Sequence, residues 1–215
     1  MTSSAELGKR LIESMMARRV PPGTHLSEQH LESLLGCRSP LVGVALARLE
    51  TQGFLARGED NGWRVVERSR EEAWETLAAR RLIECGLLRG ARTLDRGALQ
   101  ALQTHLSRER AAVAGGELGE SSFLSGNFHV LLAGCLGNGL LADTVRGLAA
   151  RTALIAMQCQ ASTDAVRSCD AHAQIVAALE AGDFASADGV MDRYLCWTHD
   201  GLLGRQARRR PTTAV

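Results

Sequence analysis

Glycine and proline divide residues 1–68 into segments that are long enough only for short helices and a hairpin. Apolar residues recur at helical spacing over residues 4–18, and Pro21-Pro22-Gly23 ends that helix because proline cannot continue it. Ser27 is a suitable N-cap for a second short helix, and Gly36 is suited to end it. The sequence therefore predicts a helix, a tight turn and a second helix in this order.

A third helix is predicted to begin at Arg38 or Ser39 and to end at Gly53. Its expected buried residues share one helical face, and they are Val42, Ala45, Leu46 and Leu49. Two short helices joined by about four residues that include glycine form a helix-turn-helix, whose second helix enters the major groove of DNA. Residues 58–62 are turn formers between two apolar segments, which predicts a β-hairpin that would form a wing.

The order of these elements, and the residues within them, resemble the DNA-binding half of the GntR-family transcription regulators. The framework positions that match the family pattern are Pro22, Gly23, Leu26, Glu28, Leu31, Leu35, Gly36, Val42, Ala45, Leu46, Leu49 and Gly53. Two arginines that reach bases and phosphates in the family fall on Ser39 and Gly43 here, and the family's glutamate falls on Val44. The resemblance thus implies a winged helix-turn-helix that lacks two of the usual DNA contacts.

Other arginines are placed to supply DNA contacts. Arg38 precedes the position of one lost arginine, Arg48 lies farther along the predicted recognition helix, and two more arginines of the wing can touch phosphates. The candidate DNA-binding residues are Arg38, Ser39, Arg48, Arg57, Gly62 and Arg64. Residues 1–68 carry nine Lys and Arg against eight Asp and Glu, a balance of +1. This charge is less basic than a tight DNA binder normally shows.

The rest of the chain is predicted to be a helical bundle. Leu and Ala dominate after residue 70, and proline is absent from residue 41 to residue 210. Amphipathic helices with short connections, which imply antiparallel neighbours, are predicted at 71–92, 95–115, 120–136, 138–160, 164–182 and 184–203. The expected fold is therefore mainly α, with a winged helix-turn-helix in residues 1–68, an antiparallel helical bundle in residues 69–205 and a basic, disordered tail in residues 206–215.

Three motifs in the bundle resemble the FCD ligand-sensing domain, which follows this type of winged helix in its family. They are Arg80-x-x-x-Glu84, the segment Asn127-Phe-His-Val-Leu-Leu that leads to Gly137-Asn138, and His172-x-x-Ile-x-x-Ala-Leu-x-x-Gly-Asp183. Together the two resemblances cover about residues 5–203. On these motifs the chain is identified as a member of the GntR family, in its FCD-domain subfamily of fatty-acid-responsive regulator-like proteins.

In many FCD domains one Asp and three His hold a divalent metal, and the equivalent positions here are Ser125, His129, His172 and Tyr194. Two imidazoles without a carboxylate make a poor site for a hard ion, and tetrahedral zinc would need a further ligand such as Cys169. No metal or other cofactor is therefore expected. A zinc-like divalent ion at the residual positions His129 and His172 is the alternative.

The resemblance also implies an effector cavity in the bundle. The candidate effector-binding residues are Arg80, Ser125, His129, His172 and Tyr194. Arg80 is the natural partner of a carboxylate because its guanidinium makes bidentate hydrogen bonds. The alternatives are a salt bridge between Arg80 and Glu84, and hydrogen-bonded core positions for the two histidines. The expected effector is therefore small and carries a carboxylate.

The six cysteines occur singly, with no Cys-x-x-Cys pair, so most of them are expected to act as small buried apolar side chains. No apolar run is long enough to span a bilayer, and the first residues lack the features of a signal peptide. The protein is expected in the cytoplasm, without a membrane partner. No nucleophile–base pair, phosphate loop or pair of carboxylates stands at a catalytic spacing, so an enzyme is not expected.

These observations predict a homodimeric transcription regulator, a repressor, that binds double-stranded operator DNA and is controlled by a small effector in the bundle. Helix-turn-helix proteins usually read two half-sites, which requires a symmetric dimer. The alternative is an effector-binding or protein-interaction module whose winged helix has lost specific DNA recognition. The missing recognition arginines favour this alternative.

Overall fold

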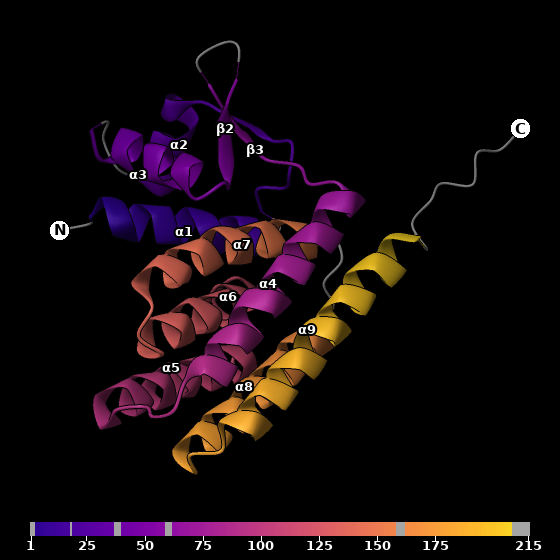
Figure 1. The fold of residues 1–215 in the computed structure, drawn as a ribbon. Coiled ribbons are helices and arrows are strands. Elements are labelled where there is room, and N and C mark those ends of the chain that lie inside the picture. Colours follow the sequence, from indigo (N-terminus) through magenta and orange to yellow (C-terminus); the bar gives the residue numbers. More distant parts are fainter. Residues whose placement is uncertain (1–2, 18, 37–39, 59–61, 158–161, 208–215) are drawn as a thin grey trace, which may run out of the picture.

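The structure is a computed structural model of the chain, and it describes residues 3–17, 19–36, 40–58, 62–157 and 162–207. A winged helix lies at one end of a bundle of long helices (Figure 1). Arg38 and Ser39 lie outside the described residues, as does the part of the predicted tail beyond residue 207. Among the helices that are described, none is sufficiently long and apolar to cross a membrane.

The described part of the winged helix has three helices and a three-stranded antiparallel sheet. These elements are α1 (Ser4–Met16), β1 (His25–Leu26), α2 (Glu28–Leu35), α3 (Pro40–Thr51), β2 (Leu55–Arg57) and β3 (Trp63–Val65). β3 lies between β1 and β2, where Trp63 pairs with Leu26 on one side and with Arg57 on the other. The helix-turn-helix and the hairpin are thus confirmed. The short strand β1 was not predicted.

Apolar residues from the helices and the sheet form the core of the winged helix. The four residues predicted to face inward from α3 are all buried, and Trp63 on β3 is 1% exposed. Gly53 follows α3 with a φ of +80°, a conformation that glycine adopts at little cost. Its carbonyl oxygen accepts a hydrogen bond from Nη2 of Arg68 (2.9 Å). The chain can therefore turn sharply from the recognition helix into β2.

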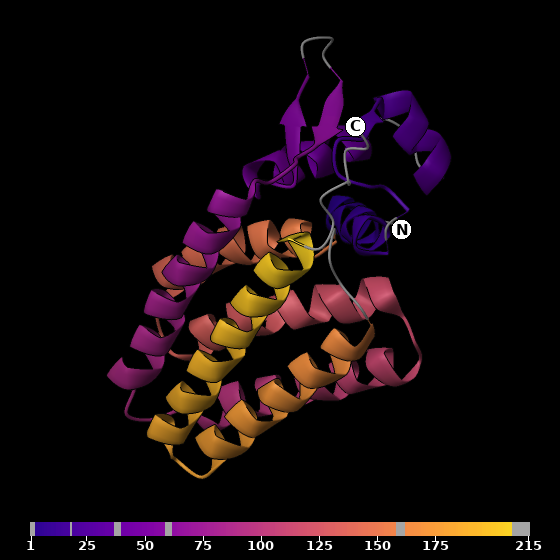
Figure 2. The ribbon, with the colours of Figure 1, turned by 90° about the vertical axis from the view of Figure 1, so that its right-hand side faces the viewer.

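Six described helices form the bundle. They are α4 (Arg70–Gly90), α5 (Arg96–Ala114), α6 (Leu118–Cys135), α7 (Gly139–Met157), α8 (Ser162–Glu180) and α9 (Phe184–Ala207). Ser69 caps α4 by accepting from the Glu72 N–H, and Asp95 caps α5 by accepting from the Ala98 N–H. α9 packs beside α4 and α8 (Figure 2). The predicted helices agree with these bounds to within a few residues, and the mainly α fold is confirmed.

The winged helix and the bundle share part of their core. Ala150 and Leu154 of α7 belong to the same buried apolar cluster as the core residues of α1 and α3. α6 approaches α1 so closely that a Cβ atom on Gly119 would lie 2.5 Å from the carbonyl oxygen of Glu13. Packing therefore crosses the boundary expected after residue 68, and α1 joins the winged helix to α6 and α7.

Four of the six cysteines lie in the described residues, and all four are free thiols. Cys85 and Cys169 are buried, and Cys135 and Cys196 are partly buried. Burial raises the pKa of Cys85 to about 12 and that of Cys169 to about 11, so both thiols stay protonated. These two side chains behave as the small apolar groups that the sequence predicts.

Candidate functional site

The exposed face of α3 is the surface that a helix-turn-helix presents to the major groove of DNA. On this face Leu41 is 42% exposed and Val44 is 58% exposed, and Arg48 is exposed one turn farther along. Gly43 stands where the family carries an arginine, and it adds no side chain. The described part of α3 therefore presents aliphatic groups on this face, with one arginine farther along the helix.

The two arginines predicted for the wing lie on its strands. Arg57 on β2 and Arg64 on β3 are both exposed. The Arg57 guanidinium lies over the Trp63 ring, 4.2 Å from its centroid, in a cation–π contact that orients it. The Gly62 carbonyl accepts a hydrogen bond from the Gly58 N–H (3.0 Å) at the base of the hairpin turn. That Arg57 and Arg64 contact DNA phosphates stays a prediction.

Four of the five candidate effector residues lie in a buried polar cluster, and the fifth, Ser125, is only partly buried. The members of the cluster come from five helices, and they are Arg80 and Glu84 (α4), Glu109 (α5), His129 (α6), His172 (α8) and Tyr194 (α9). Each is at most 9% exposed. An ionisable group that is buried without a partner is strongly unfavourable, so the contacts within the cluster decide what it can do.

Hydrogen bonds connect these side chains across the bundle. Nε of Arg80 donates to Oε1 of Glu84 (2.7 Å), and Nδ1 of His129 donates to Oε2 of the same carboxylate (2.6 Å). Nδ1 of His172 lies 3.0 and 2.9 Å from the two carboxylate oxygens of Glu109. The two histidines face each other, with 3.2 Å between their Nε2 atoms. The line of contacts thus runs from Arg80 to Glu109.

The facing Nε2 atoms require one proton between them, because two lone pairs at 3.2 Å would repel each other. Burial is the main reason that the pKa of His129 falls to about 4, so this ring is neutral and gives its single N–H to Glu84. His172 must then donate to His129 through Nε2, and a further proton must lie between Nδ1 of His172 and Glu109. With Arg80 positive and Glu84 negative, the cluster carries no net charge.

Arg80 is paired with Glu84, as in the alternative that the sequence left open. Burial alone would raise the pKa of Glu84, but the charge of Arg80 and the hydrogen bonds from Arg80 and His129 lower it to about 2. Nη2 of Arg80 is buried and has no hydrogen-bond partner within the described part of the chain. One buried donor of this guanidinium is therefore open to an acceptor such as a carboxylate.

Aromatic rings enclose the two histidines. Phe128 stacks on His172 with 4.0 Å between the ring centroids, and Tyr194 stacks on His129 at 5.3 Å. The sequence did not single out Phe128 or Glu109 as members of the site. Glu109 did carry a signal, because it is a charged residue among the apolar residues on the buried face of α5. Phe128 carried none beyond its place beside a histidine.

The donor set does not fit a resident metal ion. Only the Nε2 atoms of His129 and His172 converge, whereas structural zinc sites normally have four ligands. Ser125, at one of the family's ligand positions, offers a hydroxyl in place of a carboxylate, and Cys169 keeps a protonated thiol. No group of three or more His, Cys, Asp or Glu in the described ranges could hold a metal.

A family model for the FCD domain matches residues 75–195, more than half of the chain. The fold is similar to that of a protein from Rhodococcus sp. RHA1 described as a GntR transcriptional regulator, with a TM-score of 0.76, 20% identity and coverage of 94% of this chain and 97% of that chain. It is also similar to E. coli McbR/YncC, with a TM-score of 0.75, 18% identity and coverage of 96% and 100%. No curated protein matches the sequence significantly. At these identities the solved structures support the fold, a winged helix followed by an FCD-type bundle.

Proposed function

This chain belongs to the FCD-domain group of the GntR-family transcription regulators, and we propose that it is a homodimeric repressor controlled by a small ligand. The winged helix binds double-stranded operator DNA, and a carboxylate-bearing effector bound in the bundle ends repression. The shared core carries this proposal, because α1 joins the recognition helix to the helices that surround the buried cluster. A ligand that favours one arrangement of this core over another would shift DNA affinity.

DNA recognition is divided between the groove and the phosphates. On α3, Arg48 supplies a guanidinium, and Leu41 and Val44 suit the methyl groups of thymine, which are the apolar features of the major groove. The two wing arginines contact phosphates on the same half-site. Arg38 and Ser39, from the sequence alone, add base contacts before α3. The operator is therefore expected to carry A·T pairs beneath α3.

The effector binds at the buried cluster, and its carboxylate accepts a hydrogen bond from Nη2 of Arg80, the donor without a described partner. The rings of Phe128 and Tyr194 supply apolar contacts to the rest of the molecule. Because the cluster carries no net charge, an added carboxylate makes it negative unless a proton enters as well. Both ring nitrogens of His129 already have hydrogen-bond partners, so that proton is carried by the effector's own carboxyl group or by a carboxylate of the cluster. Effector binding is thus coupled to proton uptake.

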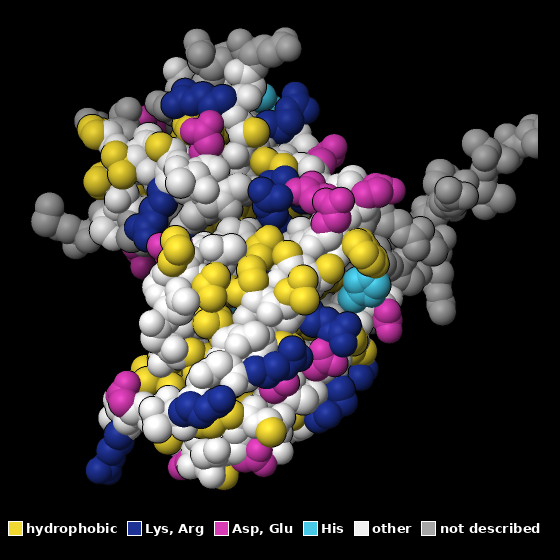
Figure 3. Space-filling model, viewed as in Figure 1, with side chains coloured by type: hydrophobic (Ala, Val, Ile, Leu, Met, Phe, Trp, Pro, Cys, Tyr) yellow, Lys and Arg dark blue, Asp and Glu magenta, His cyan; other side chains and the backbone are white. Residues whose placement is uncertain are grey.

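An exposed apolar surface on α4 and α7 suits the dimer contact. Trp74, Ala78 and Leu82 recur at four-residue spacing on α4, where Leu82 is 77% exposed, and Leu140 on α7 is 79% exposed. Figure 3 shows hydrophobic side chains gathered over these helices, next to the winged helix. Exposed apolar patches of this kind mark protein interfaces. A symmetric dimer formed through this face presents two recognition helices to two half-sites.

The same exposed face of α3 favours a second function, a protein-interaction module that does not read DNA. Val44 is apolar where the family has a glutamate, and Leu41 beside it is also exposed. Apolar side chains bury well against a protein partner. In that case the wild-type protein binds no duplex specifically. A measurement of specific binding to duplex DNA therefore distinguishes the two functions.

Genome-wide DNA capture by the purified full-length protein tests the proposal. A set of captured sites with two related half-sites is expected, and fluorescence anisotropy should show tighter binding to them than to scrambled duplexes. Arg48→Ala should weaken that binding, whereas Arg96→Ala on α5 should not. Light scattering should show a dimer, and a monomer near 23.1 kDa at micromolar concentration would contradict it. Failure to bind any captured or random duplex would reject DNA recognition and favour the interaction module.

A further inference from the structure

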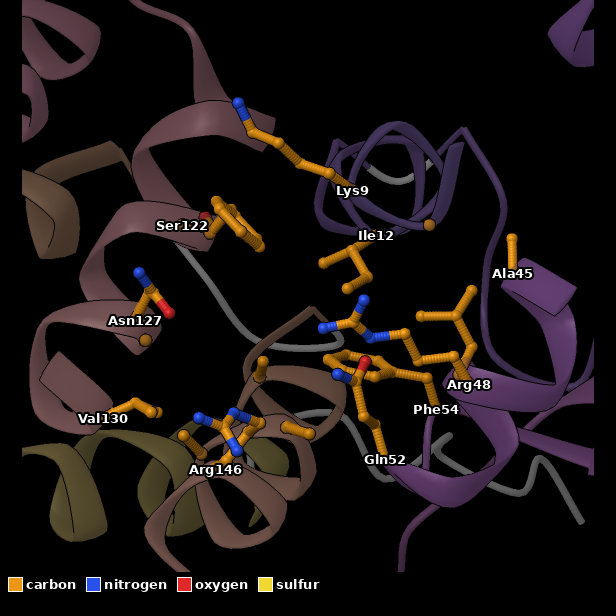
Figure 4. Close-up of a pocket in the computed structure, with 17 residues that line it drawn as sticks. Lys9, Ile12, Ala45, Arg48, Gln52, Phe54, Ser122, Asn127, Val130 and Arg146 are labelled. Atoms are coloured by element: carbon orange, nitrogen blue, oxygen red, sulfur yellow. The ribbon is translucent and has the colours of Figure 1, made fainter. Parts of the chain in front are cut away.

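A cleft of about 200 Å³ lies between the winged helix and the bundle. α1, α3 and Phe54 line one side, and α6 and α7 line the other (Figure 4). No member of the buried cluster is among the described residues that line it. The cleft is therefore separate from the effector position proposed above.

Most of the wall is apolar. Ile12, Leu49 and Phe54 line the cleft from the winged helix, and Phe123 and Val130 line it from α6, while small alanines of α7 leave space between them. An apolar cavity of roughly 150 Å³ accepts a benzene molecule. This cleft therefore has room for a ring or a short hydrocarbon chain together with one polar group.

Three cations complete the wall, and none of the described lining residues is Asp or Glu. Lys9 is held by two glutamates of α1 and α6 at 3.3 and 3.4 Å, and Arg146 is paired with Asp143. Within the described ranges, the Arg48 guanidinium forms no ion pair. Figure 4 shows this guanidinium extending from α3 into the cleft, close to the amide of Gln52. One positive charge at the cleft is thus uncompensated.

We propose that this cleft is a second small-molecule site, which binds an amphipathic monocarboxylate. The carboxylate pairs with Arg48, and the amides of Gln52 and Asn127 lie along the same cleft to receive or donate further hydrogen bonds. The hydrocarbon part lies against Ile12 and Phe123. A monoanion is favoured over a neutral ligand because the described lining residues include three cations and neither Asp nor Glu. It is favoured over a dianion because two of the three cations already have partners.

Arg48 connects this site to DNA binding. The residue lies on the recognition helix, and its single guanidinium cannot bond a ligand in the cleft and a DNA group at the same time. The ligand and the operator therefore compete, and each lowers the affinity for the other by the same factor. This competition rests on the proposed function, whereas ligand binding in the cleft does not.

Gly126 allows the cleft to be filled without any change of charge. It lies on α6 in the wall of the cleft, and a Cβ atom built there meets nothing within 4 Å. Gly126→Leu therefore inserts an apolar side chain and raises helix propensity. Gly134 is also on α6 with equally open surroundings, but it does not line the cleft. Gly134→Leu is the matched control.

Calorimetric titration of the full-length protein with octanoate and 4-phenylbutyrate tests the proposal, with 4-phenyl-1-butanol as the neutral probe. At least one carboxylate should bind, and the alcohol should bind about tenfold more weakly or not at all. Gly126→Leu and Arg48→Gln should each weaken carboxylate binding by about tenfold or more, and Gly134→Leu should leave it unchanged.

Three results would overturn the site. The first is that neither carboxylate binds at millimolar concentration. The second is that the alcohol binds as tightly as the carboxylates. The third is that carboxylate binding persists in both Gly126→Leu and Arg48→Gln. The titration contains no DNA, so a winged helix that fails to bind any duplex leaves its outcome unaffected. If operator binding is found, the bound carboxylate should weaken it in wild type and not in Gly126→Leu.

Discussion

A carboxyl group lies next to a cation both at the centre of the bundle, where Glu84 meets Arg80, and at the junction where α1 meets α6, where Glu13 meets Lys9. The pKa values of these two carboxyl groups are shifted in opposite directions. In the bundle, Arg80 and His129 outweigh the effect of burial and lower the pKa of Glu84 to about 2. At the junction, burial and the hydrogen bond with Glu120 raise the pKa of Glu13 to about 7. Glu84 is much the more buried of the two, so the neighbouring charges, rather than burial, decide which carboxyl is ionised.

Because of this difference, the two regions differ in how easily their arrangement can change. The buried cluster compensates its own charges, so its ion pairs hold the helices in one arrangement. The junction is partly open to solvent, contains Glu13 with a pKa raised to about 7, and keeps Arg48 without an ion-pair partner in the described residues. A ligand or a change of pH can therefore alter the junction at lower cost than the cluster.

The largest effect is expected from Glu84→Ala, which breaks the cluster. The substitution leaves Arg80 buried without its ion pair, so the free energy of unfolding should fall by about 3–5 kcal/mol. The matched change at the junction, Glu120→Ala, removes a partly exposed ion pair and should cost about 1 kcal/mol or less. Urea unfolding at pH 7 measures both. Equal losses would show that the two regions do not differ in this way.

Lowering the pH should change the stability contributions of the two regions in opposite directions. The pKa of His129 is about 4 in the fold against an ordinary 6.5, so its contribution is present above pH 6.5 and is lost as the pH falls towards 4. This loss reaches about 3 kcal/mol, and Glu84 adds a further loss between pH 4.5 and 2. Glu13 has a raised pKa, so its contribution is present below pH 4.5 and is lost as the pH rises through 7.

Unfolding free energies measured from pH 4 to pH 8 check these signs. Wild type should lose stability towards pH 4, because the Glu13 term is partly screened by solvent and amounts to about 1 kcal/mol. Glu13→Gln should make the loss towards acid steeper, since it removes the opposing term. A wild-type protein that becomes more stable between pH 6.5 and pH 4 would contradict the proton assignment in the cluster.

The helices and the recognition face could be predicted from the sequence because their signals are local. The spacing of Val42, Ala45, Leu46 and Leu49 gave the buried face of α3, and glycines gave the breaks between the bundle helices. The candidate residues Arg80, His129, His172 and Tyr194 were also brought together as expected. Here the resemblance to a family supplied the alignment of separate helices, which spacing alone does not.

The partners of these residues could not be predicted in the same way. His172 meets Glu109 across 63 positions of sequence, and a contact of that range depends on how helices are ordered in the bundle. The shared core had no sequence signal either, because Ala150 and Leu154 look like ordinary apolar residues of one bundle helix. The pairing of Arg80 with Glu84 was predictable as an alternative, since four-residue spacing places the two side chains on one face.

Gly119→Ala should show how tightly the junction is packed. The added Cβ atom would lie 2.5 Å from the carbonyl oxygen of Glu13, and backbone must move to relieve this contact. The cost should be about 1–3 kcal/mol, as for other overpacked positions. Gly126→Ala on the same helix adds a Cβ atom with nothing within 4 Å and should be neutral or slightly stabilising. Thermal unfolding compares the two, and equal midpoints would show that the junction yields easily.

A smaller effect is expected at the wing, which lies away from both regions. Arg64→Ala should weaken binding to all captured duplexes alike and reduce the salt dependence by about one phosphate contact. Arg48→Ala should instead change the preference among duplexes, because its guanidinium belongs to the recognition helix. Anisotropy titrations at several salt concentrations distinguish the two. If Arg64→Ala changes the preference among duplexes, the wing itself takes part in base recognition.

The smallest effect is expected from removal of metal, and it tests what holds the cluster together. A proton between His129 and His172 accounts for their 3.2 Å contact, and two imidazole nitrogens alone bind a divalent ion weakly. Dialysis against a chelator should therefore leave the thermal midpoint of unfolding unchanged, and elemental analysis should find little metal. About one metal ion per chain after dialysis against plain buffer would overturn the proton-bridged arrangement. His129→Gln and His172→Gln would then show which ligands hold the ion, because loss of a true ligand lowers the metal content and the midpoint together.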